Sequence, residues 1–385
     1  MNKVIGAVSR YLRQTDRTLL LFSLLASAYG MVLVYSATLS AKSGSFLMRT
    51  VLVQGAAVLI GLVAMIVLSK IDYHTMGNVW KFVAAAGVLL LTATLVLGKS
   101  TNTGSLDQSW ITFGSMSLQP AEIVKVMFIL TFAKQYDMVK DNLSPLNVAL
   151  LCLHAAVPIG LILITQDMGM VLVYTLLFLG MLFASGVKLR YFAGGGIALL
   201  LATPLIWEKL FKAGGTQRNR IMALLDPTNP LYSKDTYQQK QAVSAIGSGE
   251  IWGYGLFKGP KTQSYYALPE KRNDMIFAVT GEELGLIGCL AVFLIFVVLL
   301  ARFLIVAAHA KDGFGSMICV GVFCSFAVQV GINIGVVLQL LPVIGITLPF
   351  FSQGGTSTVS AFLALGLVLS VHMHRKELMF ADQDG

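Results

Sequence analysis

Apolar residues in this chain come in long blocks separated by shorter polar connections. A helix needs roughly 20 apolar residues to cross the hydrocarbon core of a bilayer, which is about 30 Å thick. Only 12% of the 385 residues are charged and 56% are hydrophobic, whereas a soluble domain carries about 25% charged residues. The sequence therefore predicts an all-α polytopic membrane protein with about ten transmembrane helices.

We treat residues 1–385 as one membrane domain, within which residues 212–275 form a large extracytoplasmic loop. The ten predicted spans run from Thr18 to Ala37, Phe46 to Ser69, Trp80 to Leu97, Ala121 to Phe132, Leu146 to Ile164, Met168 to Ser185, Tyr191 to Trp207, Ile276 to Val306, Met317 to Leu340, and Thr356 to His372. The fourth is short for a full span and the eighth is long.

The orientation follows from Lys and Arg, which concentrate in the short cytoplasmic loops of membrane proteins. With a cytoplasmic N-terminus, the loops on that side carry Lys70, Lys134, Lys140, Lys188, Arg190, Arg302, Lys311, Arg375 and Lys376. The short opposite loops hold only Lys42 and Lys99. An even number of spans then places both termini in the cytoplasm. The net charge of +9 is thus mainly a topology signal, and we predict no nucleic-acid partner.

The loop of residues 212–275 has nine Lys or Arg against five acids. Turn signals such as Asp226-Pro227 interrupt it, while aromatics such as Trp252 and Tyr254 argue against disorder. A net-positive external loop at the membrane surface suits an anionic, lipid-linked substrate such as a pyrophosphate. A packed cap without a ligand is the alternative.

Ionisable residues inside spanning segments are costly and are functional candidates by default. Glu122 and Lys125 lie three residues apart, so they share a helix face and can pair. Glu282 and Glu283 follow Gly281 in the eighth predicted span. The Glu122–Lys125 pair could equally serve only to neutralise two buried charges and pin helix packing, and Glu282 or Glu283 could cap a helix start or bond a neighbouring helix.

Asp274 lies where the long loop meets the eighth predicted span. A carboxylate there, beside basic residues and facing a cavity, could accept a proton from a sugar hydroxyl. Asp is also a favoured N-cap, so the residue alone leaves both roles open. The chain contains no P-loop, GxGxxG, CxxC or HExxH motif, so nucleotide, dinucleotide and zinc chemistry lack support. Its four cysteines fall inside apolar blocks, which indicates buried thiols without disulfides.

Several blocks together resemble the SEDS family (shape, elongation, division and sporulation), which includes RodA and FtsW. They are Trp110 to Gly114, Gln119 to Lys125, Tyr237 to Gln241, Ala245 to Gly249, Gly253 to Gly255, Leu268 to Glu270, Asp274 to Ala278, Gly281 to Gly285, Asn333 to Gly335, Leu341 to Gly345, Leu348 to Ser352, and Gly354-Gly355. They occur in family order on a matching ten-helix plan.

The chain departs from the family pattern at four positions. Gln166 replaces the proline of a Gln-Pro-Asp-Leu-Gly block, and Asn273 stands where Thr is common. Thr347 and Gln353 stand where the family has Pro and often Tyr. The carboxylates are kept, so the activity is expected, while the subfamily stays open.

The resemblance implies a peptidoglycan glycosyltransferase that polymerises lipid II into β-1,4 glycan strands on the outer face of the cytoplasmic membrane. Conversion of an α-linked donor on undecaprenyl pyrophosphate into a β-linked product implies inversion with one general base, assigned to Asp274. Expected substrate-binding residues are Arg218 and Arg220 first, then Lys240, Lys261, Glu122, Lys125, Glu282 and Glu283. A divalent cation, Mg²⁺ or Mn²⁺, could bridge the phosphates; its ligands are unknown.

Two other functions stay open. A lipid II flippase or lipid transporter would use the intramembrane charges for translocation, and a scaffold for cell-wall assembly would need no chemistry. The resemblance implies a class B penicillin-binding protein (a transpeptidase) as partner, alongside lipid II and membrane lipids. The sequence does not distinguish elongation, division and sporulation.

Overall fold

The computed structural model describes residues 6, 9, 11–40, 44–99, 108–113, 116–210, 215–226 and 228–375. The features predicted at Lys42, Gly114, Lys212, Pro227 and Lys376 lie outside the described residues.

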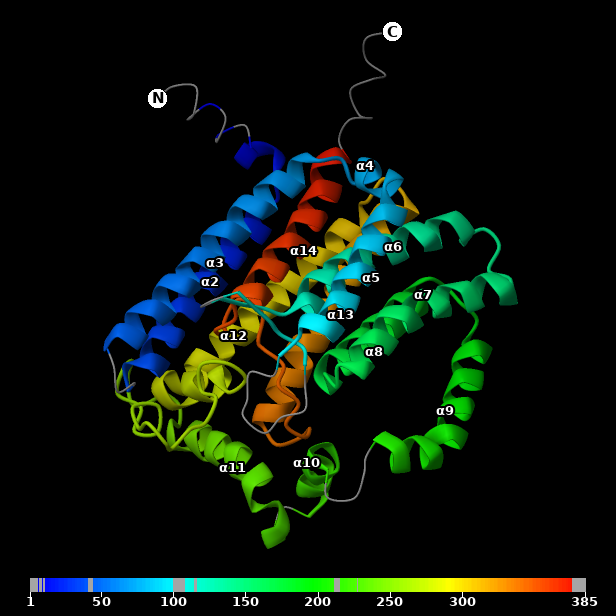
Figure 1. Ribbon diagram of the computed structural model, residues 1–385. Coiled ribbons are helices and arrows are strands. Elements are labelled where there is room, and N and C mark those ends of the chain that lie inside the picture. The colour runs from blue at the N-terminus through cyan, green and yellow to red at the C-terminus, as the bar shows by residue number, and fades with distance from the viewer. Residues whose placement is uncertain are drawn as a thin grey trace.

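Each of the ten predicted spans falls on a helix (Figure 1). These helices are α2 (Arg17–Leu39), α3 (Gly44–Lys70), α5 (Trp80–Leu97), α6 (Pro120–Val139), α7 (Pro145–Ile164), α8 (Met168–Ala184), α9 (Leu189–Leu210), α12 (Ile276–Ala308), α13 (Gly313–Val337) and α14 (Gly355–His374). Shorter elements connect them: α4 (Tyr73–Asn78), α10 (Thr216–Leu225), η1 (Pro230–Tyr232), α11 (Ser233–Ser248), and a hairpin of β1 (Ile111–Phe113) and β2 (Met116–Leu118).

Within the described part of the chain, seven helices are long and apolar enough to cross a membrane: α2, α3, α5, α7, α12, α13 and α14. Helix α8 is apolar but has only 17 residues, and α6 carries Glu122, Lys125, Lys134 and Asp137. The protein is therefore a mostly helical, multi-pass membrane protein. The full count of ten spans stays a prediction.

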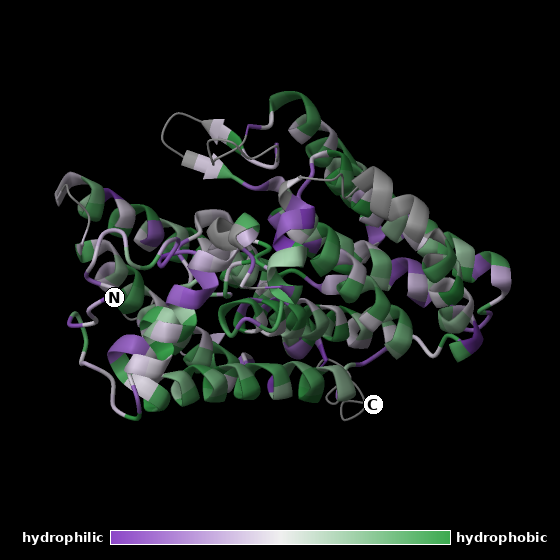
Figure 2. Ribbon diagram, turned by 90° about the horizontal axis from the view of Figure 1, so that it is seen from below, coloured by the Kyte–Doolittle hydropathy of each residue, from purple (hydrophilic) through white to green (hydrophobic). Residues whose placement is uncertain are grey.

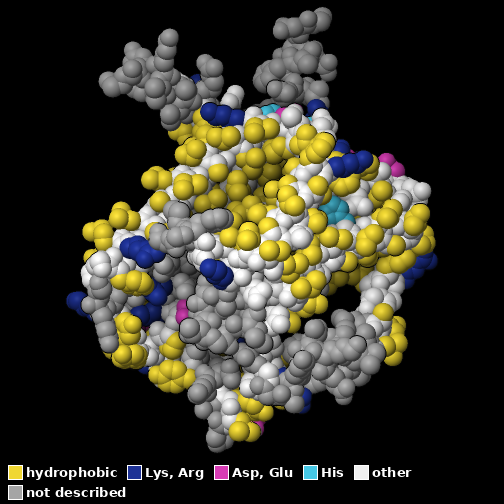
Figure 3. Space-filling model, in the orientation of Figure 1, with side chains coloured by type: hydrophobic (Ala, Val, Ile, Leu, Met, Phe, Trp, Pro, Cys, Tyr) yellow, Lys and Arg dark blue, Asp and Glu magenta, His cyan; other side chains and the backbone are white. Residues whose placement is uncertain are grey.

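The outer surface of the bundle is apolar over a broad zone. On the face shown in Figure 3, hydrophobic side chains cover the middle of the molecule, and the visible Lys and Arg lie mainly toward its ends. Figure 2 shows the long helices coloured predominantly hydrophobic. Exposed leucines such as Leu52, Leu59 and Leu89, each more than 60% exposed, are tolerable because lipid tails, not water, surround a spanning helix.

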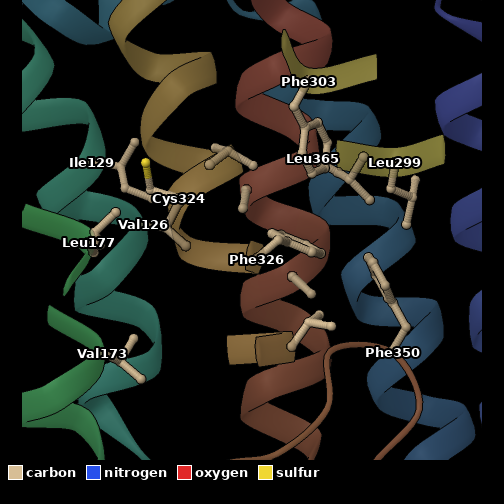
Figure 4. Packing of buried hydrophobic residues seen from close by; sticks show 14 of the residues in the cluster. Val126, Ile129, Val173, Leu177, Leu299, Phe303, Cys324, Phe326, Phe350 and Leu365 are labelled. Atoms are coloured by element: carbon tan, nitrogen blue, oxygen red, sulfur yellow. The ribbon is translucent and has the colours of Figure 1, made fainter. Parts of the chain in front are cut away.

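In the interior of the bundle, aromatic side chains such as Phe303 of α12 and Phe326 of α13 pack together with aliphatic ones (Figure 4). The ring of Phe326 lies 5.2 Å from that of Phe303 and 5.7 Å from that of Phe350. Phe350 in turn contacts Phe362 at 5.0 Å between ring centres. Because Phe350 belongs to the connection between α13 and α14, burying it fixes that connection against the core.

Helix α2 begins and α14 ends at the same end of the bundle (Figure 1). Asp16 caps the start of α2, accepting hydrogen bonds from the amides of Thr18 and Leu19. The same carboxylate accepts hydrogen bonds from Arg302 near the end of α12, and Thr15 contacts Met373 of α14. This arrangement agrees with an even number of crossings.

Helix α12 is broken once, at Gly285, whose φ of 63° and ψ of −158° are not helical. An L side chain rarely adopts this conformation, but glycine does so without strain. The break leaves the amides of Leu286 and Ile287 available to another segment. They donate to the carbonyls of Glu250 and Ile251 at 2.9 and 3.3 Å, so the segment after α11 completes the broken turn. The sequence analysis did not predict this break.

Candidate functional site

A cavity of about 1400 Å³ lies where α3, α6, α8 and α14 begin. The start of α2 is at the opposite end of the bundle (Figure 1). Residues of α10 and α11 complete the wall, together with the loop before α12 and the connection between α13 and α14. The lining thus brings together residues from seven of the blocks singled out in the sequence. Its predicted site residues are Glu122, Arg218, Arg220 and Asp274.

Helix α13 and the connection between α13 and α14, both distant from Asp274 in the sequence, hold the backbone around Asp274 in place. The side-chain amide of Asn333 on α13 donates to the backbone carbonyls of Asp274 and Ile346, at 2.8 and 2.7 Å. The hydroxyl of Ser352 donates to the carbonyl of Asn273 at 2.7 Å. The motifs around Asn333 and Ser352 therefore act together: they join the loop before α12 to the connection that Phe350 anchors in the core.

The Asp274 carboxylate is half-buried on the cavity wall. Within the described part of the chain it accepts no hydrogen bond. Burial, with a smaller contribution from the nearby Glu270 carboxylate, raises the pKa of Asp274 to about 7, although Arg220 acts in the opposite direction. A carboxylate with this pKa is matched to accepting a proton near neutral pH. Asp274 does not cap α12, because the N-cap position is Met275 and no side chain bonds there.

Four arginines line the cavity. Arg218 and Arg220 lie on α10, as predicted, and Arg49 on α3 and Arg272 beside Asp274 join them. The guanidinium of Arg272 stacks over the ring of Phe46 at 4.8 Å. Sequence reasoning did not single out Arg49, although a charged residue in a predicted span is itself a signal. Guanidinium groups suit phosphate oxygens because their donors match phosphate geometry in pairs.

Glu122 and Lys125 form the predicted pair. The ammonium of Lys125 lies 2.6 Å from the Glu122 carboxylate and 2.9 Å from the side-chain oxygen of Gln329 on α13. The Gln329 amide donates back to Glu122 at 3.2 Å. All three residues are at most 3% exposed. Glu122 is on the cavity wall, and Lys125 lies behind it, outside the lining.

Glu282 and Glu283 lie outside the cavity lining and are fully buried. Glu282 accepts hydrogen bonds from the amides of Lys261 and Thr262 and from the Thr262 hydroxyl, at 2.6–2.8 Å. Glu283 accepts from the hydroxyl of Ser36 at 2.6 Å. The bond between Glu283 and Ser36 of α2 agrees with the structural alternative, a bond to a neighbouring helix, whereas Glu282 bonds the segment before α12.

The two lysines predicted to bind substrate also lie outside the cavity lining. Lys240 is an exposed residue of α11. Lys261 is partly buried, and its backbone amide bonds Glu282.

The chain matches the FtsW/RodA/SpoVE family of cell cycle proteins over residues 16–377. It belongs to this family. It is 32% identical over 366 residues to the peptidoglycan glycosyltransferase MrdB of Escherichia coli (strain K12), covering 94% of this chain and 95% of that one. It is 33% identical over 378 residues to the stage V sporulation protein E of Bacillus subtilis (strain 168), covering 94% and 98%.

This chain also shares its fold with a solved structure. That structure is a chain of a peptidoglycan synthase complex, described as coordinating polymerization and crosslinking. The TM-score is 0.77 at 26% identity, and the match covers 94% of this chain and 99% of that one.

The departures from the family pattern occur in the cavity wall. Gln166, in the position of the family proline, has a φ of 60°, which a proline ring cannot adopt. The next residue, Asp167, accepts a hydrogen bond from the side-chain amide of Gln119 at 2.8 Å. The hydroxyls of Thr347 and Ser357 lie 2.8 Å apart. The wall is therefore held by hydrogen bonds at and beside the positions that depart from the family pattern.

Proposed function

We propose that this protein is a peptidoglycan glycosyltransferase that polymerises lipid II into β-1,4 glycan strands. Family membership supports the reaction class, and relatives carry that name. The observation that carries the proposal is the position of Asp274: a carboxylate with a raised pKa, on the wall of a large cavity lined by four arginines.

In this mechanism, Asp274 acts as the general base. It accepts the proton of the GlcNAc 4-hydroxyl of the acceptor while that oxygen attacks the MurNAc anomeric carbon of the donor. Undecaprenyl pyrophosphate leaves from the opposite face, which inverts the configuration. A general base must come within about 2.6–3.2 Å of the hydroxyl oxygen. The partial exposure of Asp274 to the cavity leaves its carboxylate accessible to that hydroxyl.

The leaving pyrophosphate needs charge stabilisation more than protonation. Arg218 and Arg220 are our first candidates, and Arg49 and Arg272 line the same cavity. Glu122 forms part of the cavity wall, where Lys125 and Gln329 hold its carboxylate in place. The other predicted substrate contacts, Lys125, Lys240, Lys261, Glu282 and Glu283, lie outside the cavity lining, and we rank them below the four arginines.

The divalent cation expected from the sequence stays a proposal. Across the described residues, no three His, Cys, Asp or Glu side chains gather into a metal site. Mg²⁺ commonly takes one or two carboxylates together with substrate phosphates. An ion arriving with the pyrophosphate would meet Asp274 and Glu270, which lie close enough to influence each other electrostatically.

We place the cavity on the outer side of the bacterial cytoplasmic membrane and both termini in the cytoplasm. The Lys and Arg asymmetry of the short loops supports this orientation. Cysteine labelling in intact cells tests it. A cysteine at Leu231, which is 79% exposed, should react with an impermeant reagent, and one at Asp312 should react only after permeabilisation. The reverse pattern would refute the orientation.

A class B penicillin-binding protein is the partner we propose, because the solved relative is part of a complex in which polymerization and crosslinking are coordinated. Purification of the protein with such a transpeptidase, followed by polymerisation of lipid II in vitro, tests both proposals. Lipid transport without polymer formation would favour the flippase, and neither activity would favour the scaffold.

The decisive variant is Asp274→Asn, which keeps the shape of the side chain but cannot accept a proton. We expect it to melt near the wild-type temperature and to bind its partner. Polymer formation should fall roughly 10²–10⁴-fold, as is typical on loss of a general base. Wild-type levels of polymer from this variant would remove Asp274 from the mechanism.

A further inference from the structure

An exposed aromatic and aliphatic patch follows α11. It comprises Ile251, Trp252, Tyr254, Leu256 and Phe257, which we call the aromatic patch. Trp252 is 78% exposed, and the others are between 37% and 56% exposed. Five large apolar side chains within seven residues would be unfavourable against water, which indicates an interaction surface.

The aromatic patch is fixed to the bundle rather than carried on a free loop. The amides of Tyr254 and Gly255 donate to the carbonyls of Glu282 and Glu283, at 3.0 and 2.8 Å. These bonds add to those that Leu286 and Ile287 make with the same segment at the break in α12. The ring of Phe257 also packs edge-on against Tyr35 of α2, with ring centres 5.7 Å apart. The patch therefore has a fixed position along the long axis of the helix bundle, which we call its height.

That height coincides with the end of a membrane-length helix. The unbroken part of α12, from Leu286 to Ala308, has 308 − 286 + 1 = 23 residues. At 1.5 Å per residue it is about 34 Å long, which matches a hydrocarbon core of about 30 Å. Gly285, and the patch bonded beside it, thus lie at the boundary of that core.

The patch also continues a lipid-facing row. Leu286, Leu290 and Leu294 recur every four residues on one face of α12 and are 52%, 55% and 60% exposed. Helix α12 meets the length and composition of a membrane span, so this row faces lipid. Because the segment bearing the patch is bonded to Leu286 and Ile287, the patch lies next to the end of this row, at the helix break.

We propose that the aromatic patch inserts into the headgroup and upper acyl region of the adjoining phospholipid leaflet and fixes the depth of this end of the protein. Trp and Tyr are enriched at membrane–water interfaces because their rings are apolar at one end and polar at the other. The exposed Lys258 directly follows the patch, and a lysine stem can extend along apolar surface while its ammonium reaches lipid phosphates.

The consequence concerns the cavity. The patch is bonded to residues 282–287, and the first segment of α12 leads from there back to Asp274. An anchored patch therefore sets the height of Asp274 relative to the lipid phosphates. This inference concerns the membrane contact alone and does not depend on the proposed chemistry.

Fluorescence quenching in proteoliposomes tests the proposal on the whole purified chain. The emission of Trp252 is obtained by subtracting the spectrum of Trp252→Phe, which keeps an aromatic ring. The vesicles contain phosphatidylcholine brominated either near the carbonyl end or near the methyl end of its acyl chains. We expect lipid brominated near the carbonyl end to remove most of the Trp252 emission, lipid brominated near the methyl end to remove much less, and aqueous iodide to remove little.

The matched control places a tryptophan at Leu231 in the Trp252→Phe background. Leu231 is 79% exposed and lies in η1, immediately before α11. Its emission should be quenched by iodide and not by brominated lipid. Quenching of Trp252 by iodide alone would show that the patch faces water. Resistance of Trp252 to both quenchers would show that protein covers it. Either result overturns the proposal.

Discussion

The carboxylates of Glu282 and Glu283 and the carboxylate of Asp274, all near the start of α12, lie in opposite environments. Glu282 and Glu283 are fully buried, and each accepts short hydrogen bonds that tie another segment to the helix. Asp274, eight residues earlier, is open to the cavity and accepts no hydrogen bond from any residue that the structure describes. The same functional group thus serves two purposes. A carboxylate whose lone pairs are already bonded holds the fold, and one that is accessible is available for proton transfer.

Glu122 combines features of both groups. It lines the cavity, as Asp274 does, but its oxygens are engaged by Lys125 and Gln329. Its environment therefore predicts a structural contribution at the wall of the site. The comparison predicts that variants of the bonded carboxylates lose stability, whereas variants of Asp274 lose activity.

The largest effect on stability is expected at Glu122. In Glu122→Gln, the buried ammonium of Lys125 loses its anionic partner, which costs roughly 3–5 kcal/mol for a buried pair. The swap of Glu122→Lys with Lys125→Glu restores opposite charges and should recover much of the loss. Thermal melting in detergent measures both. If the swap melts no higher than the single variant, the pair is not a simple structural bridge.

A smaller loss of stability is expected at Glu282. Glu282→Gln replaces a carboxylate that accepts three hydrogen bonds with an amide that has one acceptor oxygen. Hydrogen bonds to charged groups contribute roughly 1.5–3 kcal/mol, so the melting temperature should fall. Glu270→Gln is the matched control, because Glu270 is exposed, and an exposed substitution usually changes stability by about 0.5 kcal/mol or less. Equal melting temperatures for the two variants would contradict the structural role of Glu282.

The smallest effects should be displacements of the pH profile. Glu270 raises the pKa of Asp274 and Arg220 lowers it. Glu270→Gln should therefore move the acidic limb of polymerisation to lower pH, and Arg220→Gln should move it to higher pH while also slowing the reaction. Initial rates measured across the pH range of stability would reveal both shifts. A shift of the acidic limb in the same direction for both variants would contradict the opposite effects of Glu270 and Arg220 on the pKa of Asp274.

The spans were largely predictable because apolar blocks are local features. The predicted span from Trp80 to Leu97 coincides with α5, and the other nine also fall on helices. The break at Gly285 was not predictable, because the bonds that complete it come from Glu250 and Ile251 in another segment. In the predicted loop of residues 212–275 the aromatics argued against disorder, and the described part of that loop contains α10 and α11.

The candidate site was predictable only in part. Asp274, Arg218, Arg220 and Glu122 line one cavity, and the family motifs pointed to them. Lys240 and Lys261 were chosen for their charge within the loop, but the direction of a loop side chain depends on tertiary contacts that sequence spacing does not encode. Arg49 was missed for the converse reason, since it lies on α3, far from the loop in sequence.

The most direct test of the central claim is the pH dependence of kcat/KM for lipid II polymerisation, which reports the ionisations of the free enzyme. A base must be deprotonated to act, so the rate should rise with pH through the Asp274 pKa of about 7 and level off above it. Glu282→Gln should keep this limb at the same pH. The residual activity of Asp274→Asn should lack it. An unchanged acidic limb in Asp274→Asn, or a wild-type rate that does not vary through pH 7, would contradict the assignment of Asp274 as the base.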